Sequence, residues 1–243
     1  MGLDYHSAKM IQSLGDWRGS RTLTIGRQNW WLSKRESRGL GMSNPAPYSP
    51  TSYSEPFWKA IGTTCESIDK LDAERPTFVS DLSIPRAIWE SGLAGRYHNV
   101  IDLGTGEHVA DQMAYWSNLS DALADGGRLI GVLPADGLCG HGLYQYSPEF
   151  FHRMGGFMAD GPVGWFVYGP VVRFVPFDST GRHQRKFRWP AYVFFCIRKT
   201  SGGFAMPVQY ENASTPTTKP RSGRLIEMIA EIPGIRALER LIR

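Results

Sequence analysis

The chain has 243 residues, of which 42% are hydrophobic and 21% are charged, and its formal net charge is +4. This length predicts one domain with a large core, and the composition excludes a membrane-spanning protein because no run approaches the ~20 apolar residues of a span. The first residues also lack a charged and then apolar signal sequence, so we expect a cytoplasmic protein. The small positive excess is too local to predict a nucleic-acid-binding protein.

The three cysteines are spread widely along the chain. Cys65, Cys139 and Cys196 form no Cys-x-x-Cys motif and no Cys/His pair. Two of them lie in apolar, β-rich runs, where a free cysteine behaves as a small hydrophobic residue. We therefore expect reduced thiols and no zinc site at these positions.

The first predicted elements are a helix and a strand. Residues 4–17 place apolar side chains at the spacing of a short amphipathic helix. Residues 21–28 are rich in β-forming residues, and Gly26 ends this strand. Residues 39–56 contain four prolines among Ser, Gly and Tyr, a composition that excludes a helix or a central strand.

Two further β-rich runs carry an acidic residue at or near their carboxyl ends. Residues 64–69 end in Asp69, and residues 78–82 contain Asp81. A carboxylate in such a place can accept hydrogen bonds from two hydroxyl groups at once. These two acidic residues are therefore candidates for binding a ligand at the edge of a sheet.

The centre of the chain predicts a strand, a helix and a second strand. Residues 100–103 read as a buried strand that breaks at Gly104, and residues 129–133 form a second apolar run. Between them, residues 111–123 carry apolar side chains at helical spacing, and Gly126 with Gly127 is expected to stop this helix. The apolar positions are Met113, Trp116, Leu119, Ala122 and Leu123. About 35 residues in this order form a βαβ unit with a right-handed crossover, so the chain is an α/β protein.

The next segment carries a loop, a helix and two strands. Residues 134–142 form a glycine-rich loop, and Ser147 followed by Pro148 marks a helix start. The β-rich residues 163–175 and 191–198 follow. The basic, aromatic connection between them suits an exposed hairpin better than a grip on an anion or a nucleic acid.

The end of the chain predicts a linker and a helix. Residues 202–221 are rich in Pro, Thr and Ser, and residues 224–243 form an amphipathic helical pattern interrupted by Pro233 and Gly234. We expect this helix to dock on its own domain or to form a homodimer with a second subunit.

Two interpretations compete for the central βαβ unit. The letters DLGTG, residues 102–106, resemble the glycine-rich turn after the first strand of a nucleotide-binding sheet. Alternatively, Glu107, His108 and Val109, with the Leu-Ala-Asp-Gly-Gly of residues 123–127 and the apolar strand after it, resemble the fourth strand, helix and fifth strand of class I S-adenosylmethionine-dependent methyltransferases. A first glycine turn would need two more strand-helix units before the Gly-Gly turn, and about 20 residues cannot hold them. We therefore assign residues 100–103 to the fourth strand.

This resemblance, to methyltransferases of the type 11/12-like group, implies a Rossmann-like α/β fold. The fold has a seven-stranded, mostly parallel sheet with helices on both faces and an antiparallel last strand. Residues 1–200 would form this domain, with residues 39–56 as an inserted loop or lid whose Tyr48 and Tyr53 face a substrate. Residues 201–243 would form the linker and the C-terminal helix. The sequence departs from the family in its first turn, which has a single glycine, Gly26.

The resemblance also implies S-adenosylmethionine as the cofactor. In this fold the first turn approaches the methionine part of the cofactor, the residue after the second strand binds the ribose hydroxyls, and residues after the third strand face the adenine. Asp72 is the alternative to Asp69 for the ribose. The positions that match are Gly26, Arg27, Gln28, Asp69, Asp81, Leu82, Gly104 and Thr105.

The catalytic candidates are Glu107, His108 and His141. We favour His141 as the general base because it lies between two glycines in a loop past the fifth strand, whereas His108 begins a helix. Quinone O-methyltransferases with a similar Glu-His-Val use a glutamate three positions earlier as part of a metal site. Gly104 stands there in this chain, so no metal is predicted.

The expected reaction is O-methylation of a small molecule or sugar hydroxyl. Two alternatives remain open. In the first, the chain is a methyltransferase-like domain without activity that serves as a binding or scaffolding partner. In the second, a different nucleotide occupies the cleft expected for S-adenosylmethionine.

Overall fold

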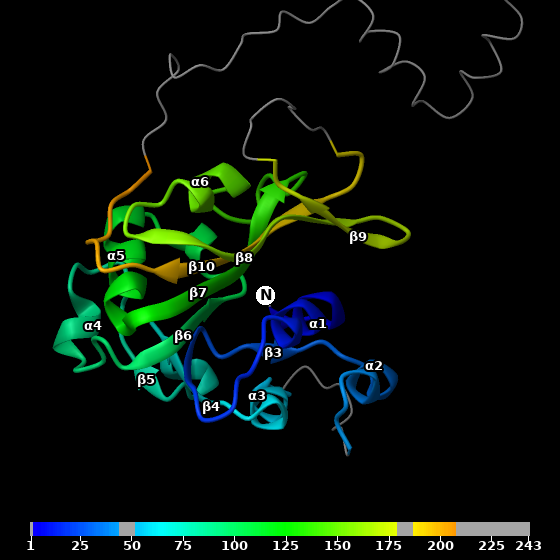
Figure 1. Cartoon of the computed structure of the whole chain (residues 1–243), viewed down its shortest axis with the longest axis horizontal. Helices are drawn as coiled ribbons and strands as arrows, with labels where there is room; N and C mark the ends of the chain where they lie inside the picture. The colour runs from blue at the N-terminus through cyan, green and yellow to red at the C-terminus, as the bar shows by residue number, and fades with distance from the viewer. Residues whose placement is uncertain (1, 44–51, 179–186, 208–243) are drawn as a thin grey trace, which may run out of the picture. The chain divides into compact units, whose positions relative to one another are not determined.

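The structure, a computed structural model, describes residues 2–43, 52–178 and 187–207 (Figure 1). Residues 44–51, the centre of the predicted lid with Tyr48, lie outside the described residues, as do the basic connection at 179–186 and the predicted C-terminal helix. Among the helices of the described ranges, none has the length and apolar character needed to cross a membrane.

The main sheet has eight strands, and its order identifies the fold. Across the sheet the strands are β5 (Phe78–Val79), β4 (Thr64–Asp69), β2 (Arg21–Ile25), β6 (Tyr97–Asp102), β7 (Leu123–Asp136), β10 (Ala191–Lys199), β8 (Phe157–Tyr168) and β9 (Val172–Pro176). The pairs from β5 to β7 are parallel, and β10 is antiparallel to both of its neighbours. The first five strands in chain order thus lie in the order 3-2-1-4-5, which is the Rossmann-like order.

This order confirms the assignment of the central strand and of the antiparallel last strand. Strand β6 lies beside β2, where a fourth strand belongs, so the loop after β6 is not the first glycine turn. The predicted run 163–175 is split into β8 and β9, which makes the sheet one strand wider than the seven expected.

Helices cover both faces of the sheet. Successive side chains of a strand point to opposite faces, and accordingly Val100 belongs to one hydrophobic cluster and Ile101 to the other. Helices α4 (Ala87–Glu90), α5 (Gln112–Ala122) and α6 (Pro148–His152) pack on the first face, and α1 (Tyr5–Ser13) and α3 (Glu55–Ile61) on the second. The remaining elements are α2 (Lys34–Gly39), the short 3₁₀ helices η1 (Asp72–Glu74) and η2 (Gly106–His108), and a two-stranded parallel sheet of β1 (Gly2–Leu3) and β3 (Asn29–Trp30).

Helix α5 forms where the apolar spacing predicts it. Asp111 caps the helix by accepting a hydrogen bond from the Ala114 amide at 2.9 Å. Trp116 and Leu119 are fully buried, whereas Met113, another apolar residue of this spacing, is 54% exposed. Met113 lies four residues before Ser117 on the outer side of the helix, and the Ser117 hydroxyl is 4.0 Å from its sulfur.

Gly126 and Gly127 do not end helix α5, which corrects the sequence interpretation. The helix ends at Ala122, and β7 begins at the next residue. Tyr97 pairs with Leu123 and Asn99 with Arg128, so residues 124–127 bulge out of the strand. Gly126 adopts φ +73° in this bulge, a conformation that other residues rarely adopt.

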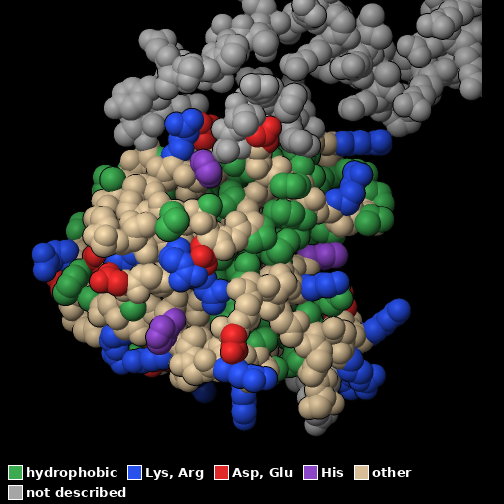
Figure 2. All heavy atoms as spheres, in the orientation of Figure 1, with side chains coloured by type: hydrophobic (Ala, Val, Ile, Leu, Met, Phe, Trp, Pro, Cys, Tyr) green, Lys and Arg blue, Asp and Glu red, His purple; other side chains and the backbone are tan. Residues whose placement is uncertain are grey.

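The surface carries its positive charge in many places. Figure 2 shows Lys and Arg side chains distributed over the drawn face rather than gathered in one basic patch. This distribution agrees with the small net charge of +4.

Candidate functional site

The candidate site lies at the carboxyl edge of the parallel strands. After β2 the chain adds β4 and β5 on one side of this strand, and it then crosses back to add β6 on the other side. The order of the strands therefore reverses between β2 and β6. In open α/β sheets a crevice forms at such a switch point, outside the carboxyl ends of the strands. The loops after β2, β4 and β6 carry most of the residues that the sequence predicts for the site.

The turn after β2 is held close to both neighbouring loops. The Gly26 amide donates a hydrogen bond to the Ile68 carbonyl at 2.7 Å, and the Thr105 hydroxyl donates to the Ile25 carbonyl at 3.0 Å. Gly26 has φ +76°, and a Cβ there would lie 3.2 Å from Thr105 Oγ1 and 3.6 Å from Asp69 Oδ2. Glycine therefore keeps this junction open, as the predicted close backbone approach requires.

Gln28 offers an unused acceptor beside this turn. Its side chain is 3% exposed, and its amide nitrogen donates to the carbonyls of Ile25 and Gly26. Its Oε1 is buried and accepts no hydrogen bond from any described residue. Because buried polar atoms are normally paired, this oxygen is a candidate contact for a ligand donor.

Asp69 ends strand β4 with one carboxylate oxygen engaged locally. Oδ1 accepts a hydrogen bond from the Leu71 amide at 3.1 Å. Oδ2 is the oxygen that lies near Gly26. The alternative residue, Asp72, begins η1 and is exposed, so the structure places Asp69, not Asp72, next to the Gly26 turn.

Asp81 and Leu82 are committed to contacts within the chain. Asp81 pairs with the Lys70 ammonium at 2.8 Å and accepts from the Ser83 amide and hydroxyl, and the bonds from Lys70 and Ser83 lower its pKa to about 2. Leu82 is 6% exposed, and its carbonyl accepts from Asn118 at 3.0 Å. The third strand was predicted over residues 78–82, but β5 ends at Val79. Both residues therefore lie in the turn after the strand.

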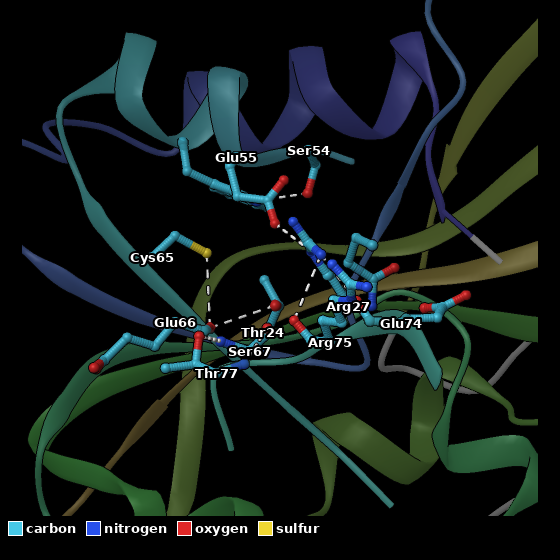
Figure 3. Close-up of polar contacts among 12 residues, drawn as sticks. Thr24, Arg27, Ser54, Glu55, Cys65, Glu66, Ser67, Glu74, Arg75 and Thr77 are labelled. Carbon is cyan, nitrogen blue, oxygen red and sulfur yellow. Dashed lines mark hydrogen bonds and ion pairs between the residues drawn. The ribbon is translucent and has the colours of Figure 1, made fainter. Parts of the chain in front are cut away.

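Arg27 braces the loops around the site (Figure 3). Its Nε is 2.6 Å from Glu55 Oε1, and its Nη1 donates to the Glu74 carbonyl at 2.9 Å. The guanidinium also lies 3.9 Å from the centre of the Tyr53 ring. This side chain, one of the expected cofactor contacts, is thus engaged by residues of α3 and η1.

Asp102 organises the loop after β6. Its fully buried carboxylate accepts hydrogen bonds from the amides of Gly104, Thr105 and Gly106 at 2.8–3.1 Å, and from the Tyr115 hydroxyl at 2.8 Å. Burial raises the pKa of Asp102, and these donors oppose the shift. Asp102 was not among the site residues predicted from the sequence. Its signal was an aspartate at the end of an apolar strand, directly before glycine-rich residues whose amides can turn back onto it.

The three catalytic candidates lie together. Glu107 is fully buried, and its Oε1 lies 3.7 Å from His108 Nε2 and 3.5 Å from His141 Nε2. The two imidazole rings are 5.4 Å apart, centre to centre. Burial and the nearby Asp102 charge raise the pKa of Glu107 to about 8, whereas burial and His141 lower the pKa of His108.

Backbone contacts bring His141 to this cluster. The amides of Leu143 and Tyr144 both donate to the Glu107 carbonyl, at 2.7 and 3.2 Å. A Cβ on Gly142 would lie 2.7 Å from Glu107 Cγ, so only glycine permits this approach. The loop that carries His141 is therefore tethered to η2.

Comparisons with known proteins give only distant likenesses. No protein-family model matches the chain, and no curated protein matches it. Several solved methyltransferase structures resemble it. The 1,6-didemethyltoxoflavin-N1-methyltransferase of Burkholderia thailandensis, bound to its substrate and S-adenosylhomocysteine, is 15% identical over 81% of this chain and 78% of that chain, with a TM-score of 0.45.

Two further structures match less of their own length. The phosphoethanolamine N-methyltransferase 2 of Haemonchus contortus is 15% identical over 52% of this chain and 27% of that chain, with a TM-score of 0.31. The trans-methyltransferase CalH is 12% identical over 81% of this chain and 57% of that chain, with a TM-score of 0.46. The chain spans less than two thirds of the length of both. These identities and TM-scores are too low to carry a conclusion about the function of this chain.

Proposed function

We propose that the chain is an S-adenosylmethionine-dependent methyltransferase. The observation that carries this proposal is the junction at the switch point, where Gly26 lies against Asp69 Oδ2 and the Gln28 side chain, and where Gln28 Oε1 is a buried acceptor without a partner among the described residues. Gln28 Oε1 can accept from the ammonium group of the cofactor, and Asp69 can accept from its ribose hydroxyls. The resemblance of the central βαβ unit to class I methyltransferases supports the same assignment.

The first turn favours a cofactor without a pyrophosphate. Dinucleotides place their pyrophosphate at the N-terminus of a helix that directly follows the first strand. Here β2 is followed by β3, and the next helix, α2, begins only at Lys34. No helix N-terminus in the described residues directly follows β2, so the turn suits a sulfonium cofactor better than a dinucleotide.

We propose that the methyl acceptor binds beside the cluster of Glu107, His108 and His141. These residues follow β6 and β7, at the same edge of the sheet as Gly26 and Asp69. S-Adenosylmethionine, when bound, supplies an activated methyl group. A hydroxyl acceptor must then lose a proton, and the exposed imidazole of His141 is the group that we propose to take it. A small-molecule or sugar hydroxyl is the proposed acceptor.

A second candidate is a methyltransferase-like domain that binds but does not transfer. The single glycine of the first turn and the engagement of Arg27 by Glu55 favour it. Formation of S-adenosylhomocysteine in the presence of an acceptor distinguishes the two. Binding of the cofactor without any turnover across a panel of hydroxyl acceptors would support the second candidate.

Replacing Asp69 with alanine tests the cofactor site. We expect Asp69→Ala to weaken binding of S-adenosylhomocysteine by about 1 to 3 kcal/mol, roughly 5- to 150-fold, because the ribose hydroxyls would lose their carboxylate acceptor. Calorimetric titration of each variant measures this change. Asp125→Ala is the matched control, since Asp125 is exposed in the bulge of β7 at the opposite end of the sheet.

The outcome also decides between the two aspartates. Loss of affinity in Asp72→Ala with normal affinity in Asp69→Ala would reject the assignment of Asp69 while keeping the cofactor. Equal affinity in all three variants would reject the proposed ribose site.

A further inference from the structure

We propose that Glu107, His108 and His141 form a binding site for one divalent transition-metal ion, of the class that imidazole and carboxylate groups ligate, such as Zn²⁺. Each residue offers one ligand atom, and the three atoms lie within 4.8 Å of one another. They come from η2 and from the loop between β7 and α6, so the site exists only in the folded chain. No metal was predicted from the sequence because Gly104 stands at the position of the third ligand, and His141 supplies this ligand from a different loop.

The carboxylate of Glu107 is the observation that points to a missing partner. Its side chain has no exposed surface, and neither of its oxygens accepts a hydrogen bond from any described residue. Burying a carboxylate without donors is costly, and buried charges are paired or coordinate metals. The Nε2 atoms of His141 and His108 lie 3.5 and 3.7 Å from Glu107 Oε1, which is too far for a hydrogen bond.

These separations suit a shared metal ligand set. Ligands at about 2.0–2.2 Å from a tetrahedral Zn²⁺ lie roughly 3.4 Å from one another. The two observed separations from Glu107 Oε1 differ from that value by only a few tenths of an ångström. Small rotations of the exposed imidazole rings would close the site around an ion.

The backbone holds the ligands in place without the ion. The Glu107 carbonyl accepts from the amides of Leu143 and Tyr144, and the Tyr144 hydroxyl donates to the Ala110 carbonyl at 2.8 Å. The loop that carries His141 is thus attached to Glu107 and to Ala110, on either side of His108. Such preorganisation lowers the cost of bringing the three ligands together.

The donor set selects the class of metal. Two imidazoles with one carboxylate suit Zn²⁺ and other first-row transition metals, whereas Mg²⁺ and Ca²⁺ prefer oxygen ligands. His108 and His141 are 50% and 39% exposed, so the ion would keep a coordination position open to solvent or to a substrate oxygen. Three protein ligands and one open position is the arrangement of a catalytic rather than a structural zinc site.

The metal site does not depend on the proposed methyl transfer. If both hold, the ion would lie beside the acceptor and would lower the pKa of a bound hydroxyl. The nitrogen of His141 that ligates the ion would then not be free to take a proton, and its role would be that of a ligand.

Direct titration of the metal-free, untagged chain tests the site. We expect calorimetry to show one Zn²⁺ per chain with micromolar or tighter affinity, and Co²⁺ to give a visible absorption band that Zn²⁺ removes. Glu107→Gln, His108→Ala and His141→Ala should each weaken Zn²⁺ binding by at least about 100-fold, since even residues outside the ligand shell can cost that much. His98→Ala is the control, because His98 is exposed near the start of β6, at the other end of the sheet.

The result that would overturn the proposal is absence of Zn²⁺ binding below millimolar concentration, or binding that persists in the His108→Ala, His141→Ala double variant. Both histidines are partly exposed, so these variants keep the test valid even if Glu107→Gln fails to fold, and a melting curve of each variant verifies folding. The titration contains no cofactor and no acceptor. A failure of metal binding is therefore distinguishable from a failure of the methyltransferase proposal.

Discussion

Asp102→Ala is expected to lower the free energy of unfolding by about 2 to 4 kcal/mol and to abolish measurable cofactor binding. The substitution leaves the amides of Gly104, Thr105 and Gly106 and the hydroxyl of Tyr115 without their common acceptor. A buried donor left unpaired costs about 1 to 3 kcal/mol, and removal of the buried charge offsets part of this loss. Urea denaturation measures the stability, and calorimetry measures the binding.

Two variants sharpen this prediction. Asp102→Asn keeps the oxygen that serves Gly104 and Thr105 but turns an amide group toward the Gly106 amide, so its stability should lie between wild type and Asp102→Ala. Asp125→Ala, at an exposed position, should stay within about 0.5 kcal/mol of wild type. An Asp102→Ala protein as stable as Asp125→Ala would show that the loop does not depend on this carboxylate.

In protein kept free of metal by a chelator, His141→Ala is expected to reduce turnover by roughly 100-fold or more at unchanged cofactor affinity, the loss typical of a general base. His108→Ala should have a smaller effect under the same conditions, because burial and the nearby His141 lower the pKa of His108 and so disfavour its protonated form. The measurement is the initial rate of S-adenosylhomocysteine formation with an acceptor that the wild type methylates.

The control for His141 is the cofactor titration of the same variant. A variant that binds cofactor normally and turns over at nearly the wild-type rate would remove His141 from the mechanism. A variant that loses cofactor affinity in parallel with turnover would instead assign it a role in binding.

The strands were predictable because their signals are local. Residues 64–69 read as one strand ending in Asp69, with β-branched Thr64 and Ile68, and β4 has these bounds. The assignment of β6 as the fourth strand rested on the resemblance of residues 107–109 and 123–127 to class I methyltransferases and on chain length, since too few residues lay between residues 102–106 and the Gly-Gly turn for two more strand-helix units. The observed sheet order confirms that reasoning.

The site was predictable only in part, because its geometry depends on contacts between distant segments. The sequence named Glu107, His108 and His141, yet nothing in it indicated that the Leu143 and Tyr144 amides bind the Glu107 carbonyl. Likewise, Arg27 looked free to bind a ligand until the structure placed Glu55 beside it. Pairings that span about 30 residues leave no periodic pattern in the sequence.

Isothermal titration calorimetry of the wild-type chain tests the central claim, which is that a sulfonium cofactor binds at the Gly26 and Asp69 junction. S-Adenosylmethionine, S-adenosylhomocysteine and NAD⁺ are titrated side by side under the same conditions. The account predicts binding of the first two with micromolar dissociation constants and no heat from NAD⁺. Absence of heat with both S-adenosyl compounds, or tighter binding of NAD⁺ than of either, would contradict it.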